Sequence, residues 1–220
     1  SRPIKMVYTL DGTTPTPSST IYTSPIKVSD NTIIKIATVL PSGKMSRIRT
    51  VNVEKQTYAP AIKIDGVKSG LQMSRVKGNF LKVDDLNWTD AEWEKSIISN
   101  LEQIKIQRKD DGATLRGANN YAAIAEGYIN IPEDGVYYLS SRLEQVWIDN
   151  KLVVNNEGDV KASTTNDSSV ALAKGLHPIK VVFLANIIGG WPSWWSSTAI
   201  EMRKDNEKEF TAVGGSQLFR

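Results

Sequence analysis

The sequence has no cysteine among its 220 residues. This absence excludes disulfides, thiol nucleophiles and thiolate zinc sites together, although it does not fix the cellular compartment. A long apolar run is also missing, because the longest such stretch, residues 179–188, is interrupted by Lys180 and Asn186. It is far shorter than a helix that crosses a bilayer, so we expect no transmembrane segment.

A dominant charge of one sign is missing as well. The chain has 27 Lys and Arg residues against 24 Asp and Glu residues, and its net charge of +3 is scattered. Such a distribution offers no footprint for a nucleic-acid backbone and no polybasic membrane anchor, so neither partner is expected. With 40% apolar and 23% charged residues, the chain can bury a core and does not have the composition of a disordered tail.

Candidate catalytic groups are few. His177 is the only histidine, and its position before Pro178 at the opening of a strand-like run favours a structural role over that of a general base. Neighbouring residues on a strand point to opposite faces, so adjacent carboxylates rarely act together on one bond. We interpret the adjacent acidic pairs as turns and solvated positions, and these pairs are Asp84-Asp85, Asp110-Asp111 and Glu133-Asp134.

Short β-like runs separated by Gly, Pro, Asn and Asp fill most of the chain. Thr32–Val39 is a β-branched run of strand length, and Asp149-Asn150 is a two-residue loop suited to a type I′ hairpin turn. Many short strands at this spacing predict a sandwich, and the pattern predicts an all-β fold of two tandem β-sandwich domains.

One segment predicts a helix. Thr89 followed by Glu92 fits a capping box, and Trp93, Ile97 and Ile98 fall on one side of a helix at 89–101.

The first part of the sequence carries four blocks whose order and spacing are specific. They are Tyr8–Pro15, Tyr22–Ile26, Lys35–Ala37 and Gly43–Ser46. These blocks resemble the small Ig/fibronectin-like β-sandwich at the C-terminal end of chitobiases and β-hexosaminidases. The resemblance implies such a domain at residues 1–58, truncated at its start because the family's usual first strands are missing.

The remainder resembles the β-sandwich domain of the anthrax protective-antigen type, which is jelly-roll-like and common in secreted glycosidases, adhesins and toxins. The matching stretches are Gly127–Tyr137, Val146–Val154 and Leu172–Val181. The resemblance implies this domain at residues 59–220. The pairing of the two modules in this order resembles the C-terminal region of a bacterial β-N-acetylhexosaminidase of glycoside hydrolase family twenty.

That family catalyses hydrolysis with an adjacent Asp-Glu pair on a (β/α)₈ barrel. This sequence contains no Asp-Glu dipeptide. It also lacks the alternating strands and helices, over about 250 residues, that such a barrel needs. We therefore expect a non-catalytic accessory region of an exported glycoside hydrolase, with no cofactor, located in the periplasm, at the cell surface or outside a bacterium. The alternatives are an independent carbohydrate-binding or adhesion module and a purely structural spacer.

In adhesin members of the protective-antigen-type family, two successive acidic residues before the hairpin help to bind calcium and, through it, sugar. The corresponding positions here hold Ser141 and Arg142. Calcium requires oxygen ligands, and Arg142 brings a positive charge, so no metal site is expected.

The last candidate is a loop rich in tryptophan. Trp191, Trp194 and Trp195 lie within five positions, next to Gly189-Gly190 and Pro192. Aromatic faces suit the apolar faces of sugars, and they equally suit packing at a domain interface. The sequence therefore predicts that these three residues contact either a glycan or the parent protein's own catalytic barrel, with burial in the domain's own core as the structural alternative.

Overall fold

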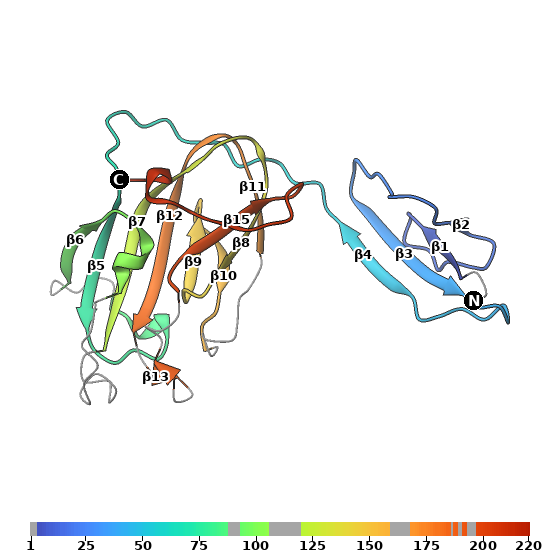
Figure 1. Cartoon of the computed structure of the whole chain (residues 1–220), viewed down its shortest axis with the longest axis horizontal. Helices are drawn as coiled ribbons and strands as arrows, with labels where there is room; N and C mark the ends of the chain where they lie inside the picture. The colour runs from blue at the N-terminus through green and yellow to red at the C-terminus, as the bar shows by residue number, and fades with distance from the viewer. Residues whose placement is uncertain are drawn as a thin grey trace. The chain divides into compact units, whose positions relative to one another are not determined.

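The computed structural model describes residues 4–87, 93–105, 120–158, 168–185, 187–188, 191–192 and 197–220. Within these ranges the regular elements are strands, apart from short 3-10 helices at Val83–Asp85, Leu101–Ile104 and Gly215–Gln217. The predicted all-β class is confirmed. No helix in the described part of the chain is long and apolar enough to cross a membrane. The chain divides into two compact units, Ser1–Gln56 and Thr57–Arg220 (Figure 1).

The first unit contains one antiparallel sheet in the order β2-β1-β3-β4. Its strands are β1 (Lys5–Thr9), β2 (Thr20–Ile21), β3 (Thr32–Val39) and β4 (Arg49–Val53). Val7 and Ala37 are register partners on β1 and β3, and both are buried. Among residues 4–56 this sheet is the one that the structure describes, and its small core centres on that pair.

The second unit is a sandwich of two antiparallel sheets. The larger sheet has the order β10-β9-β12-β7-β5-β6, with β17 also paired to β7. Its strands are β5 (Leu71–Lys77), β6 (Glu94–Ile98), β7 (Tyr121–Ile131), β9 (Gln145–Ile148), β10 (Lys151–Asn155), β12 (Gly175–Ala185) and β17 (Leu218–Phe219). The smaller sheet, β11-β8-β15-β16, consists of β8 (Gly135–Ser141), β11 (Ser168–Leu172), β15 (Ile200–Lys204) and β16 (Thr211–Ala212).

The main core lies between these two sheets. Because strand side chains alternate between faces, every second residue of a strand points to this core. Leu139 on β8 and Leu172 on β11 meet Ile129, Val181 and Phe183 from the larger sheet, and all five are fully or almost fully buried. A separate two-stranded ribbon joins β13 (Ile187–Ile188) to β14 (Trp191–Pro192).

The helix predicted at Thr89–Leu101 is wrong over its described part. Residues 94–98 form β6, which pairs with β5 from Leu71↔Ile98 to Arg75↔Glu94. Strand alternation places Ile98 in the core and leaves Ile97 60% exposed. Pairing with the open edge of β5 satisfies the backbone hydrogen-bonding groups of both strands. These hydrogen bonds favour the strand more than the helical spacing of the apolar residues favours a helix. Residues 88–92, which carry the expected capping box, lie outside the described residues.

Glu102 connects the 3-10 helix at Leu101–Ile104 to the segment before β15. Its carboxylate accepts hydrogen bonds from the Thr198 backbone N–H and the Ser197 hydroxyl, each at 3.0 Å, and lies 2.5 Å from Lys105 Nζ. Partial burial raises the pKa of Glu102, but the hydrogen bonds from Lys105, Thr198 and Ser197 outweigh it and hold the pKa below its usual value.

Replacing Glu102 with glutamine should therefore cause a small, pH-dependent loss of stability. A carboxyl with a lowered folded-state pKa stabilises the fold above its unfolded-state pKa, here near 4.5, and that contribution disappears as the pH falls through the folded value. Glu102→Gln should lower the melting temperature at pH 7, and the two proteins should converge as the pH drops. Thermal melts from pH 7 to pH 3 test this, with Glu209→Gln at an exposed position as the control. A deficit that persists unchanged at pH 3 would contradict it.

Candidate functional site

The outer face of the larger sheet changes character halfway along its two central strands. At one end, Ala122 on β7 and Leu184 on β12 are buried beneath Val83 and Leu86, which belong to the segment between β5 and β6. At the other end the outward positions of β7 are Glu126 and Tyr128, and this segment does not cover them. As far as the described residues show, half of the face is therefore packed, and half is open.

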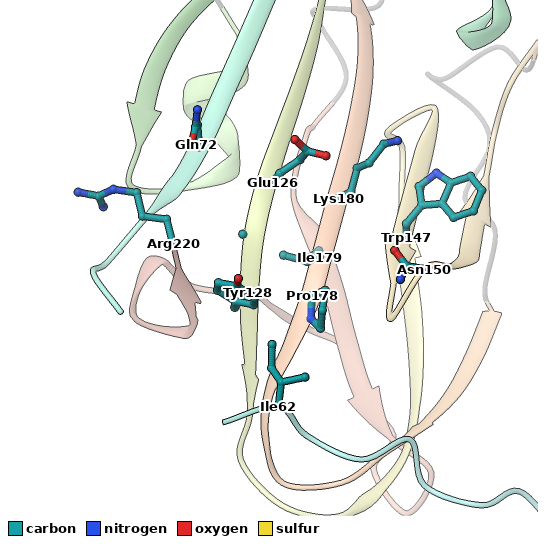
Figure 2. Close-up of a pocket in the computed structure, with 11 residues that line it drawn as sticks. Ile62, Gln72, Glu126, Tyr128, Trp147, Asn150, Pro178, Ile179, Lys180 and Arg220 are labelled. Atoms are coloured by element: carbon teal, nitrogen blue, oxygen red, sulfur yellow. The ribbon is translucent and has the colours of Figure 1, made fainter. Parts of the chain in front are cut away.

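The open half forms a cleft of about 570 Å³, shown in Figure 2. The sheet and the β9–β10 turn supply most of its aromatic and polar lining. These lining residues are Gln72, Glu126, Tyr128, Trp147, Asn150 and Lys180. Arg220 and Ile62 complete the rim. The cleft thus combines two half-buried aromatic rings with charged and amide groups, which include both hydrogen-bond donors and hydrogen-bond acceptors.

Strand register places four of these side chains in one line across the sheet. Gln72 on β5 is paired with Glu126 on β7, Glu126 with Lys180 on β12, and Lys180 with Trp147 on β9. Residues that are directly opposite each other on neighbouring strands share a face. Figure 2 shows Glu126, Lys180 and Trp147 projecting from three neighbouring strands in that order.

The Trp147 ring is held in a fixed orientation. Its Nε1 donates a hydrogen bond to Gln145 Oε1 at 3.0 Å, and Lys180 Nζ lies 5.8 Å from its ring centroid. Gln145 Nε2 in turn donates a hydrogen bond to Glu157 Oε2 at 3.4 Å. The other oxygen of this carboxylate accepts a hydrogen bond from the Val83 backbone N–H at 2.8 Å. An aromatic surface fixed in this way loses little conformational entropy when a ligand binds against it.

His177 anchors the turn at one end of the cleft. It is fully buried, with Nδ1 2.7 Å from Asp149 Oδ2 and Nε2 2.8 Å from the Ala173 carbonyl oxygen. Through Asp149, His177 holds the turn that contains Asn150, a cleft residue.

Arg220, which follows β17 and lines the cleft, is held by hydrogen bonds to the segment before β5. The Arg220 backbone N–H donates to the Lys68 carbonyl at 2.8 Å, and the Lys68 N–H donates back at 2.9 Å. The Arg220 guanidinium also donates to the Ser69 carbonyl. These contacts fix the position of Arg220, which lines the cleft together with Gln72.

The tryptophan loop remains a prediction. Trp191 belongs to β14, where its backbone pairs with Ile188, but its side chain is not described. Trp194 and Trp195 lie outside the described residues.

Ser141, at one of the two positions that are acidic in the calcium-binding adhesins, is engaged in protein contacts. Ser141 Oγ donates to the Ala199 carbonyl at 2.9 Å, and the Ser141 carbonyl accepts from Asn156 Nδ2 at 2.7 Å. In the described ranges, no three His, Asp or Glu side chains gather in a way that could hold a metal ion.

Calcium should therefore leave the melting temperature unchanged. A ligand that binds only the folded state adds about 2.7 kcal/mol at a hundredfold excess over its Kd. Thermal melts in millimolar calcium and in a chelator should overlap, because Ser141 and Arg142 offer no acidic ligand pair. An upward shift of several degrees in calcium would show that the ion binds.

The cleft was not predicted from the sequence. A usable signal was present in the sequence of β7. Its residues are continuously apolar from Tyr121 to Ala125, and from Glu126 onward more exposed residues alternate with buried ones. A strand that changes from continuous to alternating burial is covered on both faces at one end only.

Two family models match this chain. The chitobiase/beta-hexosaminidase C-terminal domain matches residues 1–50, and the PA14 domain matches residues 99–208, which is half of the chain. The Beta-hexosaminidase of Porphyromonas gingivalis (strain ATCC BAA-308 / W83) is 39% identical over all 220 residues. The chain spans 28% of the length of that relative.

Solved structures are similar at low identity. The PA14 domain of the MpAFP antifreeze protein covers 75% of this chain and 96% of its own, with 12% identity and a TM-score of 0.49. The Epithelial Adhesin 9 A domain from Candida glabrata, solved in complex with Galb1-3GlcNAc, covers 72% of this chain and 92% of its own, with 12% identity and a TM-score of 0.47. By its family-model matches, the chain belongs to the PA14 domain family, joined here to a chitobiase/beta-hexosaminidase C-terminal domain, and it resembles the C-terminal region of a beta-hexosaminidase.

Proposed function

We propose that this chain is a non-catalytic accessory region of a β-N-acetylhexosaminidase and that its outer-face cleft binds glycan. The observation that carries the proposal is the cleft itself, in which Trp147 and Tyr128 lie half-buried among polar side chains on paired strands. Aromatic rings contact the apolar faces of sugars, and the surrounding amide and charged groups suit their hydroxyl and acetamido groups.

The composition of the cleft supports binding without hydrolysis. Glycosidases commonly need two carboxyl groups on opposite sides of the scissile bond. Glu126 is the one acidic side chain among the described residues that line this cleft.

The purified chain should therefore release no chromophore from chromogenic N-acetylglucosaminide or N-acetylgalactosaminide. The parent protein should release it, because the relative that is 39% identical is a beta-hexosaminidase of which this chain spans 28%. Turnover that co-purifies with this chain through several chromatographic steps would overturn the non-catalytic assignment.

We also propose that the parent protein is exported, to the periplasm, the cell surface or the medium, where polymeric glycans are accessible. The basis is the resemblance of both modules to those of secreted glycosidases. Cell fractionation with an antibody against the chain tests this, and recovery in the cytoplasm alone would refute it.

A second candidate role is packing against the parent's catalytic barrel. The composition of the loop with Trp191, Trp194 and Trp195 favours it, because large aromatic residues dominate interfaces as well as sugar sites. Binding of this chain to a separately expressed barrel, lost in Trp194→Ala and Trp195→Ala, would support it.

Isothermal titration with N-acetylglucosamine oligosaccharides tests the glycan-binding role. Trp147→Ala should weaken binding by roughly tenfold, since removing a large aromatic contact costs more than about 1 kcal/mol at a typical interface. Tyr58→Ala is the matched control, because Tyr58 is 44% exposed and does not line the cleft. Equal affinity of Trp147→Ala and the wild type would contradict the assignment of the cleft.

A further inference from the structure

Protein residues close the cleft at both of its ends along the strand direction. Along β12, the outward residue Val182 is covered at one end by Val83 and Leu86. At the other end, the Ile62 backbone N–H donates to the Leu176 carbonyl at 2.9 Å, and the Ile62 side chain lines the cleft. A ligand that followed the strand direction would meet both walls.

Across the strands, paired positions on four neighbouring strands all line the cleft. The line of paired residues runs from Gln72 through Glu126 and Lys180 to Trp147, and all four line the cleft. Neighbouring strands are about 4.8 Å apart, so this line spans three strand spacings, or about 14 Å. A hexopyranose ring in an extended glycan is about as long as one such spacing.

From this match we infer that the cleft takes a linear oligosaccharide lying across the strands, with one sugar unit over each of the three spacings between Gln72 and Trp147. The inference rests on the proposed glycan-binding function and adds the length and direction of the ligand. Trp147 stacks against the unit at one end, and Gln72 with Arg220 binds the unit at the other end.

The two central side chains suit the middle unit. Glu126 supplies acceptor oxygens and Lys180 supplies donor protons from directly opposed positions on β7 and β12. Both lie on paired strands in the middle of the sheet, so their positions are set by backbone hydrogen bonds on both sides. Hydroxyl groups, which donate and accept, are complementary to such an opposed pair.

Affinity as a function of ligand length tests the inference. We expect β-1,4-linked N-acetylglucosamine or glucose oligosaccharides to gain about tenfold in affinity for each unit up to three, the change that roughly 1.4 kcal/mol of added contact produces. Four- and five-unit ligands should bind no more tightly than the trisaccharide. The measurement is isothermal titration of the full chain with each purified oligosaccharide.

Substitutions at the two ends distinguish this geometry from a single-sugar site. Trp147→Ala and Gln72→Ala should each reduce the affinity for the trisaccharide to about that of a disaccharide. At least one of the two variants should bind the monosaccharide with nearly wild-type affinity. Tyr58→Ala should follow the wild-type length series. Equal affinity for one and three units, or a rise that continues beyond three, would overturn this inference alone. No binding of any oligosaccharide would overturn the proposed function together with it.

Discussion

Replacing Gly127 with alanine should destabilise the second unit by roughly 1–3 kcal/mol, the usual range for forcing an atom into a packed site. A Cβ at this position would lie 2.2 Å from the Phe219 carbonyl oxygen and 2.7 Å from Leu71 Cδ2. Gly127 is where β7 changes neighbour, because it pairs with β5 as far as Glu126 and with β17 from Tyr128. The added methyl group must push β17 away from the sheet.

The matched control for this change is Gly214→Ala. Gly214 has a φ of −81°, and the nearest atom to its added Cβ is Ser216 Oγ at 3.8 Å, so this variant should stay within about 0.5 kcal/mol of the wild type. Thermal or urea denaturation of both variants gives the comparison. Equal stability of the two variants would show that β17 does not pack on Gly127 as described.

Replacing His177 with alanine should destabilise the second unit by about 2–4 kcal/mol. The change removes two hydrogen bonds from a fully buried ring and leaves the Asp149 carboxylate, which is 22% exposed, without this partner. For a domain of this size, each kcal/mol corresponds to a fall of roughly 2–4 °C in melting temperature.

Asp149→Asn separates the hydrogen bond from the charge. Asparagine keeps an acceptor oxygen and tolerates the left-handed backbone that residue 149 adopts, with a φ of 50°. We therefore expect a smaller loss than for His177→Ala. Differential scanning calorimetry on both variants is the measurement, and an unchanged melting temperature in His177→Ala would contradict the anchoring role.

The sequence predicted local structure well where turn chemistry and strand alternation agree. Asp149-Asn150 was predicted as a type I′ turn, and its φ values of 50° and 60° with the Ile148↔Lys151 pairing confirm it. Thr32–Val39 was predicted as a strand and forms β3 with the same bounds. In both cases short-range sterics alone favour the observed conformation.

Prediction failed where a distant partner decides the structure. Glu94–Ile98 has helical spacing, but the open edge of β5, some twenty residues earlier, captures it as a strand. The start of β7 at Tyr121 also carries no alternation of polar and apolar residues, because its first five residues are buried on both faces of the sheet.

The cleft was missed for the same physical reason. Gln72, Glu126, Lys180 and Trp147 are scattered over more than a hundred residues of sequence, and only the strand order β9-β12-β7-β5 brings them into one line. Sequence reasoning instead favoured Trp191, Trp194 and Trp195, because they are clustered in the chain. Clustering in sequence is visible without a structure, whereas register between strands is not.

The most direct test of the glycan-binding claim is a map of the bound ligand by NMR. Titrating the isotope-labelled chain with tri-N-acetylglucosamine should shift the Trp147 indole signal and the backbone amides of Gln72, Glu126 and Lys180 in a saturable manner. Signals of the first unit, such as Val7 and Ala37, should not move. Saturable shifts confined to Trp191, Trp194 and Trp195, or no shifts at all, would contradict binding in the cleft.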